Sequence, residues 1–157
     1  MLDNTLKDGK GITLVFDLFG DGDSSNLTAV IDPTSITPPA LDGGDGIDTT
    51  TLSNETYRTK QARSLIEVTD GSMTVAYDPA IWETNGAGFD ISDVLNHNGK
   101  FTITFPNDDT VDFYGYIKSF TPSELVEGEM PTAEIAIVVT NYQDADHPEV
   151  GPVWTTG

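Results

Sequence analysis

The chain has 157 residues and no cysteine, and its 26 acidic residues outnumber 7 basic ones to give a formal net charge of −19. A domain of this length buries about two thirds of its unfolded surface, and the lack of cysteine excludes disulfides, thiolate nucleophiles and thiolate metal sites. The acidity excludes a DNA-binding module, because such modules place lysine and arginine against phosphates. Many proteins are acidic simply because net charge keeps them soluble, so the charge does not by itself indicate a function.

The composition favours an all-β protein. There are 15 glycines and 9 prolines, with many threonine, aspartate and asparagine residues, which indicates numerous short connections. The N-terminus shows no apolar core of signal-peptide length, and residues 12–19, the longest apolar-rich run, are too short to span a bilayer. We therefore expect a single domain over residues 1–157 that is made in the cytoplasm and has no membrane partner.

The N-terminal third is expected to contain short strands separated by turn-forming sequence. Residues 12–19 predict a strand, residues 20–26 a turn, and residues 27–31 a second short strand. Residues 32–46 are expected to be irregular, because proline removes backbone donors and glycine permits turns. Residues 47–52 regain strand propensity through threonine and isoleucine.

The polar residues 53–61 predict either a loop or an exposed hairpin extension. This region carries a cluster of basic residues, because Arg58, Lys60 and Arg63 are three of the 7 in the chain. Beyond it, residues 63–68 and 72–78 flank a Thr-Asp-Gly sequence at 69–71, which predicts a β-hairpin.

One short helix is expected at residues 90–96. Asp90 can cap its N-terminus, and Asp93 has the spacing of a capping box. His97 lies at the other end, where partial positive charge suits the helix dipole. Trp82 is expected to pin the segment before the helix onto the sheet.

Three further strands are expected in the C-terminal half. Apolar and polar residues alternate on both sides of a Pro-Asn-Asp turn within residues 101–120, and again within residues 132–141. Side chains of a strand point alternately to its two faces. The expected apolar faces consist of Phe101, Ile103, Phe105, Val111, Phe113, Ile117, Ile135, Ile137 and Val139. The pattern predicts a β-sandwich with these residues in its core, followed by an extended C-terminal tail at residues 142–157.

Two acidic segments have spacings that could bind calcium through oxygen ligands. Asp21 and Asp23 fit the start of a calcium loop, but Asn26 replaces its required glycine and Asp32 its bidentate glutamate. The second segment contains the carboxylates of Asp42, Asp45 and Asp48. Asp-Gly runs form turns far more often than metal sites, so we assign no metal ligand.

The sequence offers little material for catalysis. Without cysteine, with only His97 and His147, and without a Gly-x-Ser-x-Gly sequence, no nucleophile and base can be assigned. Glycoside hydrolysis needs two neighbouring carboxylates. In a chain with 26 acidic residues some pair will always lie close together, so such a pair does not indicate a glycosidase. We therefore expect that the protein is not an enzyme and assign no catalytic residue and no cofactor.

The C-terminal half resembles a known family. Residues 105–119 read Phe-Pro-Asn-Asp-Asp-Thr-Val-Asp-Phe-Tyr-Gly-Tyr-Ile-Lys-Ser, and a later strand closes with Val-Thr-Asn at 139–141. Both resemble the major tail tube protein of lambda-like long-tailed (siphovirus) phages. The resemblance extends from about residue 42 to residue 141, and residues 1–41 show little that matches.

The resemblance implies an all-β sandwich with one short flanking helix, of which six copies close into a ring whose inner strands form a continuous β-barrel. Stacked rings would form the hollow tail tube of a virion, which conducts phage DNA during ejection without binding it specifically. The tail tip, tape measure and tail terminator proteins would be partners. Ring closure would pair strand edges that a lone sandwich leaves bare, and an acidic wall would repel the passing DNA.

The resemblance also implies two sets of surface residues. The arm that reaches a neighbouring subunit or ring would contain Tyr57, Arg58, Lys60 and Arg63. Candidates for lining the lumen are the outward-facing carboxylates of Glu67, Asp112 and Glu134, for which the outer wall of the tube is an equal alternative.

Two other functions fit the same sequence. One is a different phage structural role on a related fold, such as a tail terminator or a head decoration protein. The other is a calcium-dependent β-sandwich module for sugar binding or adhesion. Calcium would raise the melting temperature of such a module, because a ligand that binds only the folded state stabilises it.

Overall fold

The main feature of the fold is one antiparallel sheet of eight strands. The computed structural model describes residues 11–18, 28–31, 33–82 and 91–157. In spatial order the strands are β2 (Thr28–Ile31), β1 (Thr13–Leu18), β9 (Gly99–Thr104), β10 (Thr110–Pro122), β11 (Thr132–Val139), β8 (Gly71–Ala76) and β3 (Ser35–Thr37). The eighth strand, β12 (Val153–Thr155), pairs with the beginning of β10.

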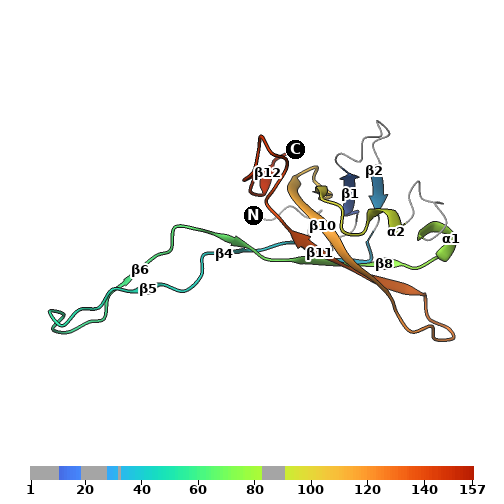
Figure 1. Cartoon of the computed structure of the whole chain (residues 1–157). Helices are drawn as coiled ribbons and strands as arrows, with labels where there is room; N and C mark the ends of the chain where they lie inside the picture. The colour runs from blue at the N-terminus through green and yellow to red at the C-terminus, as the bar shows by residue number, and fades with distance from the viewer. Residues whose placement is uncertain (1–10, 19–27, 32, 83–90) are drawn as a thin grey trace.

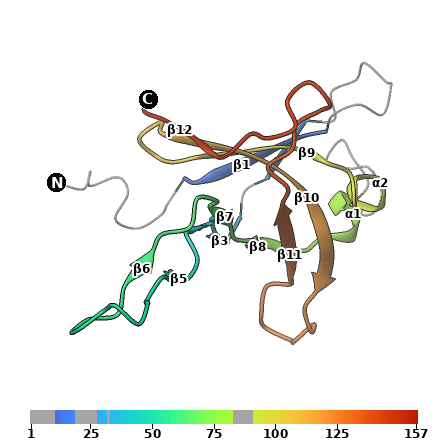
Figure 2. The same cartoon turned by 60° about the vertical axis from the view of Figure 1, so that its left-hand side comes forward.

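The long strand β10 lets this sheet fold over itself. Residues 110–115 of β10 pair with β9, whereas residues 115–122 pair with β11. A register shift between Ile117 and Ser119 interrupts the second ladder, and such a bulge bends a strand and increases its twist. The sheet therefore curls into a half-barrel, with β1, β2 and β9 in one half and β8 and β11 in the other (Figures 1 and 2).

The two halves of the curled sheet share one hydrophobic core. One half contributes Leu14, Phe16, Phe101, Ile103, Val111 and Phe113, and the other contributes Met73, Val75, Ile117, Ala133, Ile135 and Ile137. The ring of Phe101 lies 4.5 Å from that of Phe16 and 5.3 Å from that of Phe113, measured between centroids. Aromatic pairs at these separations add to the energy of burial.

The expected apolar faces are confirmed. Seven of the nine residues on them are buried, and the other two, Phe105 and Val139, are partly buried against the same core. The all-β class with a sandwich-like core is therefore confirmed, and the two layers belong to a single curled sheet.

Two single-turn helices flank the sheet, α1 (Pro79–Trp82) and α2 (Ile91–Val94). Trp82 is 6% exposed, and its indole N–H donates to the carbonyl of Ala76 at 2.9 Å. Its ring also packs 5.5 Å from that of Phe120, so the expected pinning role of Trp82 is confirmed. The expected helix at 90–96 is observed as the shorter α2, and Asp90 lies outside the described residues.

Helix α2 ends where the chain turns back to the sheet. Asn96 adopts a positive φ of 62°, and its backbone N–H donates to the carbonyl of Ile117 on β10 at 3.0 Å. His97 follows the helix and is exposed, with Nδ1 3.0 Å from the Leu95 carbonyl. No helix in the described part of the chain is long and apolar enough to cross a membrane.

The expected hairpin around residues 69–71 is wrong. β8 pairs with β11 and β3, while residues 67–68 form β7 and pair with residues 41–42, which form β4. Residues 32–46, expected to be irregular, thus supply two short strands, β3 and β4. The C-terminal residues 142–157 are mostly irregular, but they return to the sheet through β12.

Candidate assembly interface

Residues 40–69 leave the body of the protein as a long two-stranded arm. At its root, β4 (Leu41–Asp42) pairs with β7 (Glu67–Val68), and further out β5 (Ile47–Asp48) pairs with β6 (Lys60–Gln61). Figures 1 and 2 both show this arm projecting away from the curled sheet. The polar residues 53–61 are therefore part of an exposed hairpin extension, which is one of the two forms that the sequence predicts.

Side-chain hydrogen bonds hold the tip of the arm in a defined shape. The amide of Asn54 accepts from the backbone N–H of Thr51 at 2.9 Å and donates to the carbonyl of Tyr57 at 3.0 Å. The backbone N–H of Thr49 donates to the carbonyl of Thr59 at 3.0 Å across the hairpin. Asparagine and threonine therefore bond to the backbone of the turn, as they often do outside regular ladders.

A carboxylate on the arm has a similar local role. The backbone N–H of Thr50 donates to Asp48 at 2.9 Å. Hydrogen bonds from the side chain and the backbone of Thr50 lower the pKa of Asp48 below its ordinary value. Asp48 is thus engaged in turn formation and remains charged at neutral pH.

The predicted contact residues divide between the tip and the root of the arm. Tyr57, Arg58 and Lys60 lie on the outer part and are exposed. Arg63 lies near the root, where its Nε donates to the backbone carbonyl of Asp45 at 2.8 Å. Among the residues that the structure describes, neither Arg58 nor Lys60 has a carboxylate within ion-pair distance.

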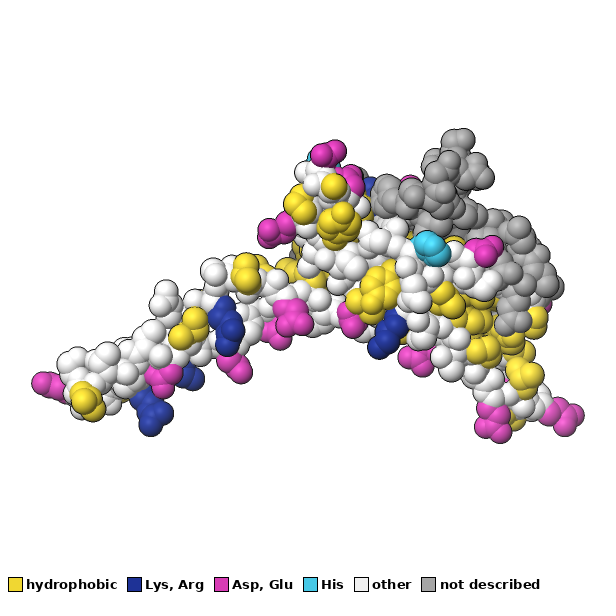
Figure 3. Space-filling view, viewed as in Figure 1, with side chains coloured by type: hydrophobic (Ala, Val, Ile, Leu, Met, Phe, Trp, Pro, Cys, Tyr) yellow, Lys and Arg dark blue, Asp and Glu magenta, His cyan; other side chains and the backbone are white. Residues whose placement is uncertain are grey.

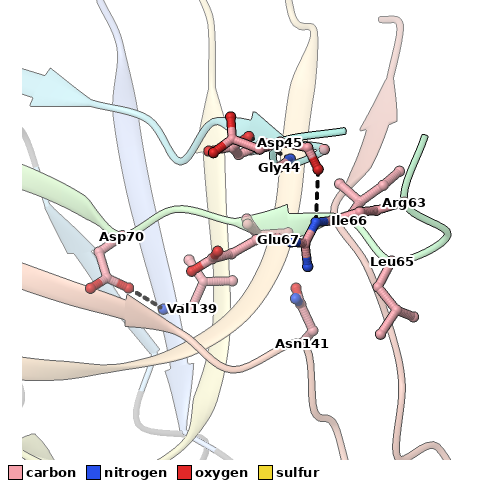
Figure 4. A pocket seen from close by; sticks show the side chains of 12 residues that line it. Gly44, Asp45, Arg63, Leu65, Ile66, Glu67, Asp70, Val139 and Asn141 are labelled. Atoms are coloured by element: carbon pink, nitrogen blue, oxygen red, sulfur yellow. Dashed lines mark hydrogen bonds between the residues drawn. The ribbon is translucent and has the colours of Figure 1, made fainter. Parts of the chain in front are cut away.

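A groove of about 670 Å³ lies at the root of the arm, and we call it the acidic groove. It contains four carboxylates, those of Asp42, Asp45, Glu67 and Asp70, and one cation, Arg63. Figure 4 shows Arg63 reaching to the carbonyl of Asp45, while Asp70 accepts from the backbone N–H of Val139 at 3.4 Å. Gly44, at a positive φ of 70°, gives the Arg63 side chain its space, because an added Cβ would lie 3.1 Å from Arg63 Cδ.

A second groove of about 350 Å³ adjoins the first, and we call it the apolar groove. Its apolar lining consists of Leu41, Leu65, Ile66, Val68, Pro152 and Trp154. The two grooves share residues 65, 66, 68 and 141, so they meet along the same stretch of the arm root. The C-terminal segment therefore contributes to this surface through residues around β12.

Large apolar side chains are exposed along the whole arm. They are Leu41, Ile47, Leu52, Tyr57, Leu65 and Ile66, and Figure 3 shows hydrophobic, basic and acidic side chains spaced along the arm. Leu52 at the tip is fully exposed, and Tyr57 is 80% exposed. At the root, Leu41, Leu65 and Ile66 line one groove together, and an exposed apolar patch of this kind marks an interaction site. Tyr57 is one of the contact residues expected from the sequence. The other five were missed, although Leu52, Leu65 and Ile66 stand out as large apolar residues in polar surroundings.

The three lumen candidates lie on three different elements. Glu67 is exposed at the arm root and lines the acidic groove. Asp112 is on β10 and forms an ion pair with Lys100 of β9 at 3.4 Å. Glu134 is exposed on β11, on the face opposite the core. The structure therefore does not bring the three carboxylates together within one subunit.

The described residues contain no group of three or more His, Asp or Glu side chains placed to hold a metal ion. In the second calcium candidate, Asp42 accepts from the backbone N–H of Gly44 at 2.8 Å and Asp48 accepts from that of Thr50. Both carboxylates thus form turns. The first candidate, with Asp21 and Asp23, lies outside the described residues.

Comparison with known proteins identifies the fold. No protein-family model and no curated protein sequence matches the chain. A chain of the six-fold symmetrised anti-feeding prophage baseplate superposes with a TM-score of 0.62 at 8% identity, covering 92% of this chain and 92% of that one.

Two tail structures match in the same way. The SPP1 tail tube gives a TM-score of 0.57 at 13% identity over 93% of this chain and 77% of that one. The tail of an empty gene transfer agent particle, refined with helical and C6 symmetry, gives 0.54 at 14% identity over 96% of this chain and 98% of that one. The protein thus has the fold of subunits found in phage tail tubes and related tail and baseplate assemblies.

Proposed function

We propose that the protein is a structural virion subunit that assembles into the tube of a phage-type tail, as the major tail tube protein of a long-tailed phage. The observation that carries the proposal is the combination of this fold with an arm, residues 40–69, in which no residue is buried. An isolated two-stranded hairpin is marginally stable in water, so such an arm gains most of its stability from a partner surface.

In this proposal the arm contacts a neighbouring copy. Tyr57, Arg58 and Lys60 at its outer part would meet that copy, and Arg63 would act at the root. Two copies with a net charge of −19 each repel each other overall, so a contact between them requires that unpaired Arg58 and Lys60 face an acidic surface of the neighbour. This charge distribution supports a homotypic contact.

The edges of the curled sheet supply a second reason to assemble. β2 and β3 are the terminal strands of the sheet in the described residues, and each has one paired neighbour. Exposed strand edges are templates for pairing with further strands. We propose that six copies close into a ring in which strands of neighbouring copies form a continuous barrel, and that rings stack into a tube.

The role assigned to the tube follows from its charge. A channel built from copies with a formal charge of −19 repels DNA, so the genome passes without specific binding. Glu67, Asp112 and Glu134 remain the candidates for its wall. The tail tip, tape measure and tail terminator proteins would be partners, the subunit would be made in the host cytoplasm, and no catalytic step is required.

Negative-stain electron microscopy of the purified protein tests the proposal. We expect six-fold rings that stack into tubes for the natural protein, and no tubes for Arg58→Glu. Lys118→Glu is the matched control, because Lys118 is also exposed but lies on β10 in the body. Monomers at every protein concentration would contradict the proposed tube function, whereas identical tubes from both variants would contradict only the role of Arg58 and the arm in assembly.

The match to the baseplate chain favours a second candidate, a ring at the base of a tail tube that does not polymerise. Its TM-score of 0.62 exceeds the 0.57 of the SPP1 tail tube. The same micrographs separate the two candidates, because a ring subunit of this kind gives single or double rings at protein concentrations at which a tube subunit gives long tubes.

A further inference from the structure

The arm presents apolar and charged side chains at both of its ends. Its outer part exposes the apolar side chains of Leu52 and Tyr57 next to the cations of Arg58 and Lys60. Its root presents the apolar groove next to the acidic groove, and the two grooves share part of their lining. Each end thus combines apolar and charged side chains. The root has an excess of carboxylates, whereas the outer part holds the cations Arg58 and Lys60 together with the carboxylates of Asp48 and Glu55.

We propose that the tip of the arm of one copy binds the root of the arm of a second copy. The apolar groove would receive Leu52 and Tyr57, and the acidic groove would receive Arg58 and Lys60. Glu67 would then lie in this contact and not in the wall of the lumen. This inference rests on the proposed function, because it names the surface that the arm contacts in an assembly. Its occupant is a second copy of this chain.

Charge complementarity is the first argument for that occupant. Five basic residues lie in the described part of the chain. Lys100 is paired with Asp112, and Arg63 already lies in the acidic groove. The outer part of the arm therefore holds two of the three remaining cations, while Glu67 and Asp70 in the groove have no ion pair among the described residues.

The same pairing cannot form within one copy. The tip and the root are at opposite ends of one extended hairpin, whose two ladders keep it extended (Figure 1). The contact must therefore join two molecules. Because tip and root are different surfaces, a one-way contact is head-to-tail and produces a closed ring or a helical array, whereas a reciprocal contact produces a two-fold dimer. The proposed tube requires the head-to-tail contact.

Engineered disulfides test the contact directly, because the natural chain has no cysteine. One sample carries Arg58→Cys and a second carries Glu67→Cys, with tags of different size. After mixing, assembly and mild oxidation, we expect a mixed dimer on a non-reducing gel, several-fold more abundant than either self-dimer. The matched control pairs Arg58→Cys with Glu124→Cys, an exposed carboxylate in the loop between β10 and β11.

A charge exchange provides a second readout. In a chain without engineered cysteines, the double variant Arg58→Glu and Lys60→Glu should no longer form rings or tubes in electron micrographs. Adding Asp45→Lys and Glu67→Lys to the same chain should restore them. Circular dichroism confirms that each variant is folded.

The outcomes separate this inference from the proposed function. Rings or tubes without the mixed dimer, or with as much dimer from the Glu124→Cys control, overturn the tip-to-root contact and leave the tube proposal standing. Neither assemblies nor mixed dimers under any condition overturns both.

Discussion

Replacing Gly115 with alanine should destabilise the subunit, because the sheet has no room for a methyl group at the point where it folds. Gly115 is opposite Gly99 on β9 and opposite Val139 on β11, so it lies where β10 exchanges one partner for the other. A Cβ on Gly115 would collide with the carbonyl oxygen of Val138 and would lie 3.3 Å from the Cα of Val139. These are backbone atoms, so relief requires β10 and β11 to separate locally.

The magnitude follows from two opposing effects. Overpacking a well-packed interior costs about 1–3 kcal/mol, whereas replacing glycine by alanine recovers about 0.4–1 kcal/mol by restricting the unfolded chain. Gly115 is not among the glycines with positive φ, so no further backbone strain is added. We expect a net loss of about 1–2 kcal/mol, which for a domain of this size lowers Tm by roughly 3–6 °C.

Thermal unfolding followed by circular dichroism, at concentrations where the protein is monomeric, measures this effect. Gly151→Ala is the matched control, because a Cβ on Gly151 meets no atom within 4 Å and Gly151 does not have positive φ. The control should keep its Tm or gain up to about 1 kcal/mol of stability. Equal Tm values for the two variants would refute the close approach of β10 and β11 as the reason for glycine at this position.

Three further predictions concern a tryptophan, a titrating carboxylate and the arm tip. Trp82→Phe should lower the free energy of unfolding by about 1 kcal/mol through loss of the indole hydrogen bond, while Trp154→Phe, at a residue that is 58% exposed, should leave the denaturation midpoint unchanged. Hydrogen bonds from Thr50 lower the pKa of Asp48 below its ordinary value of 3.8. The stability that they give to the arm is therefore complete above pH 3.8 and is lost as the pH falls through the lowered pKa. The protection factor of the Thr50 amide, which is its hydrogen-exchange rate relative to the intrinsic rate at the same pH, should therefore fall at the acidic end of a titration, and Asp48→Asn should remove this change. Leu52→Ser should not change the Tm of the monomer, because Leu52 is fully exposed, but it should reduce ring or tube formation in light scattering; a lower monomer Tm would show that Leu52 packs within its own subunit.

Local patterns along the chain were enough to predict the class of the fold and the interior of its C-terminal half. The alternation of apolar and polar residues on β9, β10 and β11 identified the buried face correctly, because the two-residue period of a strand places every second side chain on the same side. Trp82 was assigned its packing role from its position before the helix. The hairpin extension that carries Arg58 and Lys60 was anticipated as one of two alternatives, because its polar residues could not form part of a core.

Only the tertiary structure decided which strands pair and which surfaces meet. The Thr-Asp-Gly sequence at 69–71 looks like a hairpin turn, yet β7 pairs with β4 and builds the arm, because β8 is already paired on both sides, with β11 and β3, in the packed sheet. The bend of β10 at its register shift, and the close approach of Gly115 to β11, depend on strands that come from distant parts of the chain. The acidic and apolar grooves likewise combine residues around 41, 66 and 152, whose proximity no local pattern encodes.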